Sequence, residues 1–292
     1  MKARYPEGTR ELIERALRQF FPRDGRAGPL CKAMAHSLFS GGKRFRGILV
    51  AETAKAFGTD PKKVMPTACA IEYVHTYSLI HDDLPAIDDD DLRRGKPTCH
   101  VLYGEDIAIL AGDALFAEAF NLIATKQEAD DAARITRVIG EIARAAGVDG
   151  MVGGQVVDVI SSGKRVSGET LEYIHRHKTG ALIRASGRSG AILAGADERS
   201  LEKISDYAEN LGLAFQVTDD ILDVVGNTGL MGKTTGSDQR KKKATYPGIY
   251  GIERARGFAR DRVEAAKNAL VDLDLETAAL RELADFVYER QW

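Results

Sequence analysis

The fold class follows from a stretch in the middle of the chain, Leu171-Glu172-Tyr173-Ile174-His175-Arg176-His177-Lys178-Thr179-Gly180-Ala181-Leu182-Ile183-Arg184-Ala185. Apolar residues such as Leu171, Ile174 and Ala185 recur here at the three- and four-residue spacing of a helix face. The same spacing continues toward both ends, whereas alternating strand patterns are scarce. Only 8 prolines occur, and none lies between residues 97 and 247. Because proline interrupts helices, this distribution predicts an all-α protein.

Outward from this stretch, periodic apolar patterns predict helices along the whole chain. Asp60-Pro61 is a typical helix start, because aspartate caps a helix and proline suits its first turn. No linker or shift in composition divides the sequence, so we expect residues 1–292 to form a single domain. We expect a bundle of about ten or more helices, over residues 8–21, 28–39, 43–57, 61–83, 105–125, 130–147, 149–161, 168–195, 200–223, 251–269 and 274–289.

The composition is ordinary for a globular protein, with 44% hydrophobic and 29% charged residues. The formal net charge of −2 argues against a general nucleic-acid or anionic-membrane binder. Cys31, Cys69 and Cys99 are far apart and lack metal-site spacing, which fits a reducing cytoplasm. The N-terminal stretch has no apolar signal-peptide core, and we expect no segment long enough to span a membrane. We therefore expect a cytoplasmic protein with no nucleic-acid partner and no stable membrane insertion.

Residues 105–125 are nearly all apolar around the whole expected helix, from Ile107 to Phe120. A helix that is apolar on all sides either lies at the centre of a bundle or is covered by a partner subunit. The sequence favours neither arrangement over the other, so a central core helix and a dimer interface both stay open.

Two acidic clusters point to the chemistry. Asp82-Asp83 is followed by Asp88 within the stretch Leu79 to Gly95, and Asp219-Asp220 is followed by Asp223. So many carboxylates beside apolar helices repel one another unless cations offset them. Oxygen ligands suit Mg²⁺, which commonly bridges one or two carboxylates to substrate phosphates. One Asp-Asp pair alone would be read as solvated surface, but two such clusters after apolar helices favour diphosphate chemistry.

The spacing within each cluster predicts how its carboxylates lie. Asp219 and Asp223 are four residues apart, so one helix turn can present both to a metal ion. Asp82 and Asp88 are six apart, which on a straight helix would place them about 120° out of phase. Pro85 must interrupt that helix, and we expect the break to swing Asp88 back toward Asp82.

Cations accompany the acidic clusters. Gly41-Gly42-Lys43-Arg44-Phe45-Arg46 places three of them at an expected helix start, where free N–H groups also favour an anion. Arg93 and Arg94 follow the first acidic run, although charge balance alone explains them equally well. Further cations occur at Lys178, Lys233 and residues 240–243. The run 240–243 fits a solvated loop equally well.

The histidines divide into one site candidate and several structural ones. His75 lies seven residues before Asp82, on about the same helix face, so site and structural roles are equally open for it. His81 stands beside the carboxylates and fits a capping role, while His175 and His177 do not share a face and are interpreted as structural. No Ser-His-Asp, Cys-His or nucleotide-loop pattern occurs, so no protein nucleophile is expected.

Taken together, these residues resemble the trans-isoprenyl diphosphate synthases. Leu79 to Gly95 is similar to the first aspartate-rich motif of that family, and Asp219 to Asp223 is similar to the second. Other stretches match in order between about residues 40 and 250, namely Gly41 to Arg46, His75, Gly154-Gln155-Val156-Val157-Asp158, His177-Lys178-Thr179-Gly180, Phe215-Gln216, Gly232-Lys233 and Gly236-Ser237-Asp238-Gln239 before Thr245-Tyr246-Pro247.

The resemblance implies an all-α bundle of the isoprenoid synthase type around a deep central cavity, and a homodimer. It implies about three Mg²⁺, with Mn²⁺ as an alternative ion, held by Asp82, Asp83, Asp88, Asp219, Asp220 and Asp223. The residues implied to neutralise an allylic diphosphate are Arg93, Lys178, Lys233 and Lys243. Those implied to bind isopentenyl diphosphate are Gly42, Lys43, Arg46, His75 and Arg94.

The implied reaction is condensation of isopentenyl diphosphate with dimethylallyl or geranyl diphosphate, by ionisation, condensation and proton loss. Cations placed beforehand stabilise the leaving diphosphate, and an apolar cavity keeps water from the allylic cation. Gln216 and the Thr179 hydroxyl are implied to orient groups near that cation. Tyr77 and Ser78 lie about one turn before Asp82, and an aromatic residue there implies farnesyl diphosphate as the product.

Three alternatives remain. A geranylgeranyl diphosphate synthase would have a cavity floor set deeper, near Tyr73 or Val74. A terpene cyclase would lack cations such as Lys43 and Arg46 and would carry a different second metal motif. A non-catalytic subunit of a heteromeric synthase usually loses aspartates from one motif, whereas both motifs are whole here.

Overall fold

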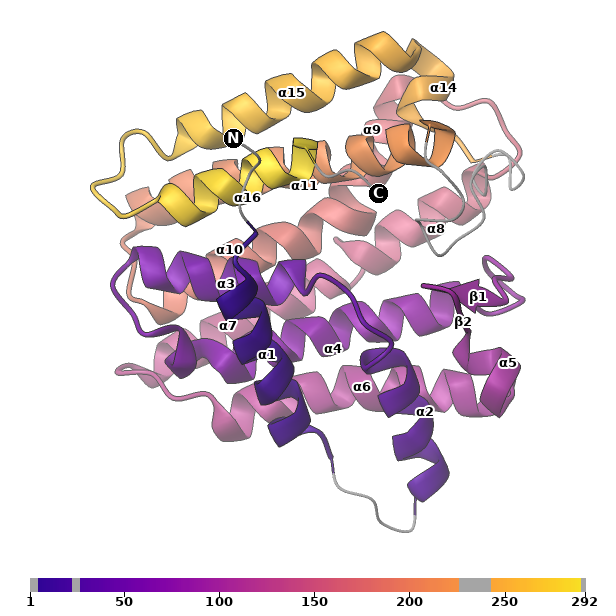
Figure 1. Cartoon of the computed structure of the whole chain (residues 1–292), viewed down its shortest axis with the longest axis horizontal. Helices are drawn as coiled ribbons and strands as arrows, with labels where there is room; N and C mark the ends of the chain where they lie inside the picture. Colours follow the sequence, from indigo (N-terminus) through magenta and orange to yellow (C-terminus); the bar gives the residue numbers. More distant parts are fainter. Residues whose placement is uncertain (1–4, 23–26, 226–242, 290–292) are drawn as a thin grey trace.

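The structure is a computed structural model that describes residues 5–22, 27–225 and 243–289. These residues form a bundle of helices with one small antiparallel hairpin, β1 (Leu92–Arg93) and β2 (Lys96–Pro97) (Figure 1). The all-α class predicted from the apolar spacing is therefore confirmed. The α-helices are α1 (Glu7–Phe20), α2 (Gly28–Leu38), α3 (Phe45–Ala56), α4 (Met65–Asp82), α5 (Cys99–Tyr103), α6 (Glu105–Lys126), α7 (Ala132–Ala146), α8 (Met151–Ser161), α9 (Gly168–Ile174), α10 (Ala181–Leu193), α11 (Glu198–Val225), α14 (Tyr246–Tyr250), α15 (Ile252–Ala269) and α16 (Ala278–Glu289).

Most of these boundaries agree with the apolar periodicity of the sequence. α4 follows a 3-10 turn, η1 (Pro61–Val64), and Asp60 Oδ1 accepts a hydrogen bond from the N–H of Lys62 at 2.9 Å. This is the cap that Asp60-Pro61 predicted. The short helices α5 and α14 and the hairpin were not expected, because segments of two to five residues are too short to carry a periodic pattern.

The segment predicted as one helix over residues 168–195 contains a change of helix type. α9 runs into a π-helix, η2 (His175–Gly180), which continues as α10. A π-turn inserts an extra residue into a turn and often marks a functional site. Lys178 and Thr179 both lie in η2 and both line the cavity described below. Apolar spacing could not predict η2, because the helix continues on both sides of it.

The core is built from helices that approach one another closely. A Cβ atom on Gly190 would lie 2.3 Å from the carbonyl oxygen of Val50, so only glycine allows α10 to contact α3 at this point. Tyr207 on α11 is fully buried, and its hydroxyl donates to the carbonyl oxygen of Leu280 on α16 at 2.7 Å. The buried cluster extends from α1 to α16, which fixes the helices that carry the site.

α6 has the apolar composition predicted for residues 105–125, but only one of its faces is buried. That face packs against α4, while Ile109 and Leu110 are 44% and 53% exposed. The alternative of a helix enclosed on all sides by its own chain is therefore wrong, and burial by a partner stays a prediction.

The length of α6 also corrects an expectation from the sequence. Its 22 residues reach a mean hydropathy of 1.7, so one segment is long and apolar enough to cross a membrane by these two criteria. The expectation that no segment has this length was wrong. A packed bundle helix meets the same criteria, and α6 lies beside α4 within the bundle (Figure 1).

Candidate active site

A cavity of about 670 Å³ lies between α4 on one side and α8, η2 and α11 on the other. It brings together residues that are far apart in the sequence. The predicted site residues that line it are Arg46, His75, Tyr77, Ser78, Asp82, Arg93, Arg94, Lys178, Thr179, Gln216 and Asp219.

Asp82 and Asp219 bring one carboxylate from each acidic cluster to this cavity. α4 ends at Asp82, and the backbone N–H of Asp88 donates to the Asp82 carbonyl oxygen at 2.9 Å. The chain therefore folds back after Pro85, as the position of the proline predicted. Burial raises the pKa of Asp82, an effect that the nearby Lys178 ammonium opposes. A desolvated carboxylate of this kind favours a nearby cation.

Asp83 does not line the cavity but holds a residue that does. It is 3% exposed, and the Arg93 guanidinium donates to it from Nε to Oδ2 at 2.7 Å and from Nη2 to Oδ1 at 2.5 Å. Burial lowers the pKa of Arg93, but its hydrogen bonds to the Asp83 carboxylate and the charge of that group outweigh burial, so the net shift is upward. Asp83 thus fixes a permanently charged guanidinium at the cavity wall.

Two lysines connect the acidic segments across the site. Lys243 Nζ lies 2.8 Å from Asp88 Oδ1 and 3.5 Å from Asp158 Oδ2. Lys178 Nζ donates to the same Asp158 oxygen at 2.6 Å. Sequence reasoning quoted Asp158 as the end of a motif without giving it a role. A sequence signal for Asp158 was nevertheless available. Asp158 lies one helix turn after Gly154, and the missing side chain of Gly154 lets Lys178 approach α8.

Asp220 is turned into the protein rather than toward the cavity. Its Oδ1 accepts from Gln216 Nε2 at 3.1 Å, and its Oδ2 accepts from the Tyr246 N–H at 2.9 Å. His175 Nε2 lies 3.4 Å from Oδ2, and burial lowers the pKa of this histidine to about 3. The Thr179 hydroxyl in turn donates to Gln216 Oε1 at 2.7 Å. A single hydrogen-bonded chain therefore orients the Thr179 hydroxyl at the cavity wall.

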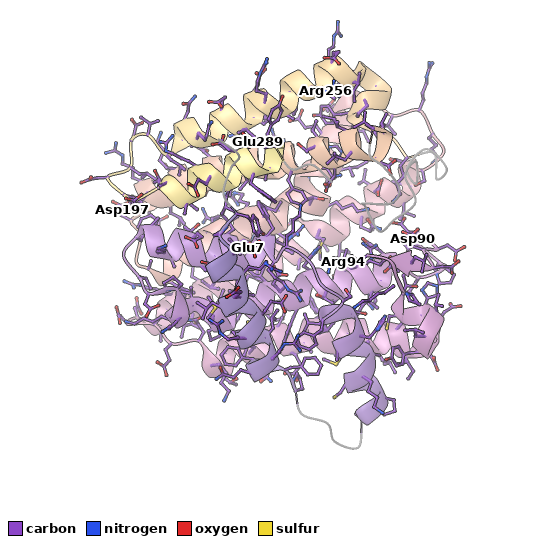
Figure 2. All side chains as sticks on the ribbon, in the orientation of Figure 1. Glu7, Asp90, Arg94, Asp197, Arg256 and Glu289 are labelled. Atoms are coloured by element: carbon purple, nitrogen blue, oxygen red, sulfur yellow. The ribbon has the colours of Figure 1, made fainter. Side chains whose placement is uncertain are left out.

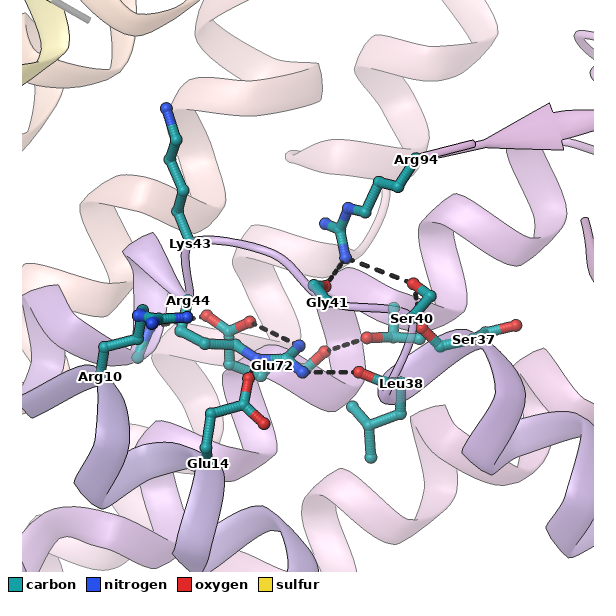
Figure 3. A network of polar contacts seen from close by, with 12 residues as sticks. Arg10, Glu14, Ser37, Leu38, Ser40, Gly41, Lys43, Arg44, Glu72 and Arg94 are labelled. Carbon is teal, nitrogen blue, oxygen red and sulfur yellow. Dashed lines mark hydrogen bonds and ion pairs between the residues drawn. The ribbon is translucent and has the colours of Figure 1, made fainter. Parts of the chain in front are cut away.

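The loop before α3 differs from its sequence interpretation. Arg44 is 4% exposed and adopts a left-handed backbone conformation with φ of 54°. Its Nε donates to Glu14 Oε1 at 2.7 Å, its Nη2 donates to the Leu38 carbonyl oxygen at 2.6 Å, and its Nη1 lies 3.7 Å from Glu72 Oε2. Figure 3 shows Arg44 within this network, whereas Lys43 points away from it. Arg44 is therefore an internal anchor, and of the three cations at this helix start Arg46 is the one that lines the cavity.

Arg46, which is buried, and His75, which is half-buried, both line the cavity. Burial lowers the pKa of Arg46, and Nε of its guanidinium is buried without a hydrogen-bond partner within the described part of the chain. Burial and the nearby Arg46 and Arg94 charges hold the pKa of His75 well below its usual range, so the imidazole is neutral. An unsatisfied buried donor is costly, so Arg46 is suited to an anionic ligand.

Arg94 lines the same cavity. Its guanidinium donates to the Gly41 carbonyl oxygen and lies 3.5 Å from Ser40 Oγ (Figure 3). Burial, with the Arg44 and Arg93 charges, lowers the pKa of Arg94 to about 10, which leaves it charged at neutral pH. Gly42 has a φ of +133°, which residues other than glycine rarely adopt, and the Arg94 guanidinium lies close to the position of its missing Cβ atom. In Figure 2, Arg94 and Asp90 lie far from Asp197, the residue that precedes α11.

Other residues of the cavity wall are apolar or aromatic. Tyr77 projects from α4, and burial, with the Asp82 charge, raises its pKa. Ser78 also lines the cavity, but its hydroxyl donates to the His75 carbonyl oxygen at 2.9 Å. The facing wall comes from α8 and includes Val152, which sequence reasoning did not select, and Val156, which it quoted within a motif without giving it a role. Their spacing of four residues, one helix turn, was the available signal.

Several predicted site residues do not line this cavity. Lys43 is exposed, and its Nζ lies 4.8 Å from the centre of the Phe286 ring. Lys233 and residues 240–242 of the basic run lie outside the described residues. The other predicted residues absent from the lining are Gly42, Asp83, Asp88, Asp220, Asp223 and Lys243.

The carboxylate oxygens at the cavity suit a hard cation, although those of the described residues are not close enough together to form a complete metal site. Among residues 5–22, 27–225 and 243–289, no three His, Cys, Asp or Glu side chains are close enough together to hold a metal ion. Asp82 and Asp219 nevertheless face one cavity with oxygen atoms alone, which is the ligand type that Mg²⁺ prefers. The raised pKa of Asp82 shows that its charge lacks full compensation from the protein.

A sequence model of the polyprenyl synthetase family matches residues 28–274, which include both acidic clusters and most of the cavity wall. The chain belongs to the polyprenyl synthetase family. The resemblance drawn from its motifs is thereby confirmed.

Individual polyprenyl synthetases agree with this assignment. The chain is 51% identical over 268 residues to farnesyl diphosphate synthase of Escherichia coli K12, covering 90% of this chain and 89% of the relative. It is 45% identical over 282 residues to geranylgeranyl diphosphate synthase of Cyanophora paradoxa, covering 96% and 94%. The solved apo structure of an FPP/GFPP synthase from Zymomonas mobilis superposes with a TM-score of 0.85 at 34% identity, covering 97% and 96%.

Proposed function

We propose that this polyprenyl synthetase is a farnesyl diphosphate synthase, which condenses isopentenyl diphosphate with dimethylallyl diphosphate and then with geranyl diphosphate. The observation that carries the proposal is a single cavity lined by the carboxylates Asp82 and Asp219 with their neighbouring cations, and also by Tyr77 and the apolar side chains of α8. A diphosphate requires the charged groups and a prenyl chain requires the apolar ones. The 51% identity to a farnesyl diphosphate synthase supports the same reaction.

Enzymes of this family depend in general on Mg²⁺. We assign the ions, about three Mg²⁺ with Mn²⁺ as an alternative, to Asp82 and Asp219 first, because both line the cavity. When bound, the metal neutralises charge that develops on the leaving diphosphate. Asp83 and Asp220 contribute by holding Arg93 and Gln216, because both have their carboxylates bonded to protein groups.

Cations of the chain bind the allylic diphosphate in the same cavity. Arg93 is held in place by Asp83 and presents its charge at the cavity wall. Lys178 lines the cavity from η2, and Lys243 bridges Asp88 and Asp158 beside it. These charges are in place before reaction, so they stabilise the departing diphosphate without reorganisation.

Isopentenyl diphosphate binds to the other group of cations. Arg46 offers a buried Nε with no partner among the described residues, and Arg94 retains its charge at neutral pH. Neutral His75 lines the same cavity near both arginines and supplies a hydrogen-bonding group. Lys43 and the backbone at Gly42 bind the outer part of this diphosphate.

The chemical step makes one carbon–carbon bond. Loss of diphosphate from the allylic substrate leaves an allylic cation, and the double bond of isopentenyl diphosphate supplies the electron pair that joins the two carbons. A proton then leaves the condensed product and passes to the departing diphosphate. Thr179 donates its hydrogen to Gln216, so the lone pairs of its oxygen are directed to the cavity side and stabilise the cation. The apolar walls exclude water.

We also propose a single-domain, cytoplasmic homodimer without stable membrane insertion. The exposed apolar residues Ile109 and Leu110 on α6, with Val101 and Leu102 on α5, support a partner on this side of the molecule. A second candidate function is geranylgeranyl diphosphate synthesis, which the 45% identity to an enzyme of that name favours.

The deciding experiment is a product assay on the purified protein. We would supply Mg²⁺, isopentenyl diphosphate and one allylic starter at a time, and size the products after dephosphorylation. Farnesyl diphosphate as the end product supports the proposal, and a twenty-carbon end product supports the second candidate. No incorporation of isopentenyl diphosphate with any starter would overturn both.

A further inference from the structure

The ring of His81 lies between Tyr77, one turn earlier on α4, and the neighbouring helix α6. The His81 and Tyr77 rings meet edge to face, with centroids 5.5 Å apart and planes at 89°. His81 Nε2 lies 3.0 Å from the carbonyl oxygen of Ile109 on α6. Because a carbonyl oxygen only accepts, Nε2 carries a hydrogen and donates it. His81 is therefore tied to α6 while it contacts Tyr77, and both rings line the cavity.

Gly112 on α6 makes this position of the His81 ring accessible. A Cβ atom on Gly112 would lie 2.1 Å from Nε2 and 2.5 Å from Cδ2 of His81. Any other residue would require the imidazole to move. Glycine weakens a helix interior, so its presence within α6 needs a packing reason, and the His81 ring supplies one.

Tyr77 is also supported from its other side by α6. Its ring lies 4.9 Å from the ring of Phe116 at an angle of 63°, and Phe116 contacts Phe120 at 5.1 Å. The Tyr77 ring is thus held between His81 and Phe116. Phe116 belongs to α6, and His81 is anchored to it by the Ile109 carbonyl. Contacts with α6 therefore help to fix the position of the Tyr77 ring, in addition to its own helix α4.

We propose that His81 and Gly112 position the Tyr77 ring, and that this pair sets the length of prenyl chain that the cavity accepts. His81 acts as a positioning residue through Tyr77. Gly112 acts by leaving room for the imidazole between α6 and the cavity. The inference rests on the proposed function, since it concerns the product length of that same reaction.

The two single substitutions have opposite expected effects. His81→Ala removes the contact that holds Tyr77 and widens the cavity, so products longer than farnesyl diphosphate increase about tenfold relative to wild type. Gly112→Ala pushes the imidazole from α6 toward the cavity that it lines, so chain growth stops earlier and geranyl diphosphate accumulates. Alanine favours helix more than glycine does, so Gly112→Ala is expected to fold.

The double variant separates this mechanism from general disruption. If Gly112→Ala acts only by displacing His81, the double variant has the product spectrum of His81→Ala alone. The matched control is Gly140→Ala on α7, where an added Cβ would meet nothing within 4 Å. Its product spectrum is expected to equal that of wild type. Thermal unfolding of each variant confirms that folded enzyme is compared.

The outcomes distinguish the inference from the proposed function. Altered product lengths, with the Gly112→Ala effect lost in the His81→Ala background, support the inference. Unchanged product lengths in both single variants, with or without a loss of rate, overturn the inference. The proposed function stands in that case as long as the variants still condense the substrates. A Gly112→Ala effect of equal size in the double variant also overturns it. Absence of any condensation by wild type instead overturns the proposed function.

Discussion

Arg44 and Glu72 face each other inside the protein, with Nη1 of the arginine 3.7 Å from Oε2 of the glutamate. Glu72 also accepts a hydrogen bond from the Gly47 N–H at 2.9 Å, at the start of α3. Each member of the pair is close in sequence to a residue of the cavity, Arg44 to Arg46 and Glu72 to His75. The ion pair therefore connects the loop before α3 to α4 just behind the proposed isopentenyl diphosphate site.

We expect Arg44→Ala to reduce the free energy of unfolding by about 3–5 kcal/mol, because it leaves Glu72 buried without its cation. Arg15→Ala is a suitable control, since Arg15 and Glu11 form an exposed pair 4.0 Å apart. The control is expected to change stability by less than about 0.5 kcal/mol. Denaturant unfolding measures both. Equal stabilities for Arg44→Ala and the control would show that the buried network is not a structural anchor.

Arg46→Ala is expected to raise the KM for isopentenyl diphosphate about tenfold to a hundredfold, the effect of losing charge-assisted hydrogen bonds. The kcat and the allylic KM should change little, because this diphosphate does not leave and is held equally in the ground and transition states. Steady-state kinetics with each substrate varied in turn gives the three constants. A rise confined to the allylic KM would reverse the assignment of the two sites.

Several residues that line the cavity could be predicted from sequence, but the direction in which other side chains point could not. Asp82, Asp219 and Lys178 belong to ordered motifs, and the structure brings them to one cavity. Arg44 stands in an equally basic motif, yet it is buried by contacts with Glu14 from a helix thirty residues earlier. Charge and spacing alone carry no information about such long-range partners.

The apolar wall was missed for a related reason. Apart from Gln155, the α8 residues that line the cavity are apolar, and such residues cannot be distinguished in a sequence from ordinary core residues. The π-turn at η2 also leaves no recognisable pattern in the sequence, although it carries Lys178 and Thr179. In both cases the tertiary arrangement decides which side of a helix meets a cavity and which meets the core.

Asp82→Ala is expected to lower kcat by several orders of magnitude, because it removes a proposed metal ligand at the end of α4. Asp89→Asn is the matched control, since Asp89 is an exposed neighbour with a left-handed backbone that asparagine tolerates. The control should retain nearly full activity. Binding of Mn²⁺ can be followed directly in both variants, and near-normal turnover in Asp82→Ala would contradict the assignment.

His175 gives a prediction about acid stability. Burial lowers the pKa of its imidazole to about 3, whereas an unfolded histidine titrates near 6.5. Below about pH 6.5 the unfolded chain therefore binds a proton that the folded chain does not. The free energy of unfolding should fall as pH decreases through this window, with a slope from this group approaching about 1.4 kcal/mol per pH unit.

The test compares wild type with His175→Phe by denaturant unfolding between about pH 5 and 7 without divalent ions. Phenylalanine keeps an aromatic ring against Tyr246, whose centroid lies 5.3 Å from that of His175, and it cannot titrate. The variant should show a shallower loss of stability toward acid pH. Parallel pH profiles for the two proteins would show that His175 does not supply this acid lability.

Tyr77→Ala is expected to lengthen the product. The Tyr77 ring lines the cavity on α4, about one turn from the carboxylate of Asp82 where the diphosphate is proposed to bind. A chain that grows from that end along α4 meets the ring, and removing it opens the space in front of Phe116. Products of twenty carbons or more should then replace farnesyl diphosphate in the dephosphorylated extract.

Two substitutions at the same place show whether ring size is the cause. Tyr77→Phe keeps the ring and should keep the wild-type product, since it removes only a hydroxyl. Ser78→Ala removes an oxygen that is already bonded to the His75 carbonyl, so it opens little space and should also leave the product length unchanged. A longer product in Tyr77→Ala alone identifies the ring as the stop. An unchanged spectrum in Tyr77→Ala would place the end of the cavity beyond it, toward the buried Tyr73 one turn earlier on α4.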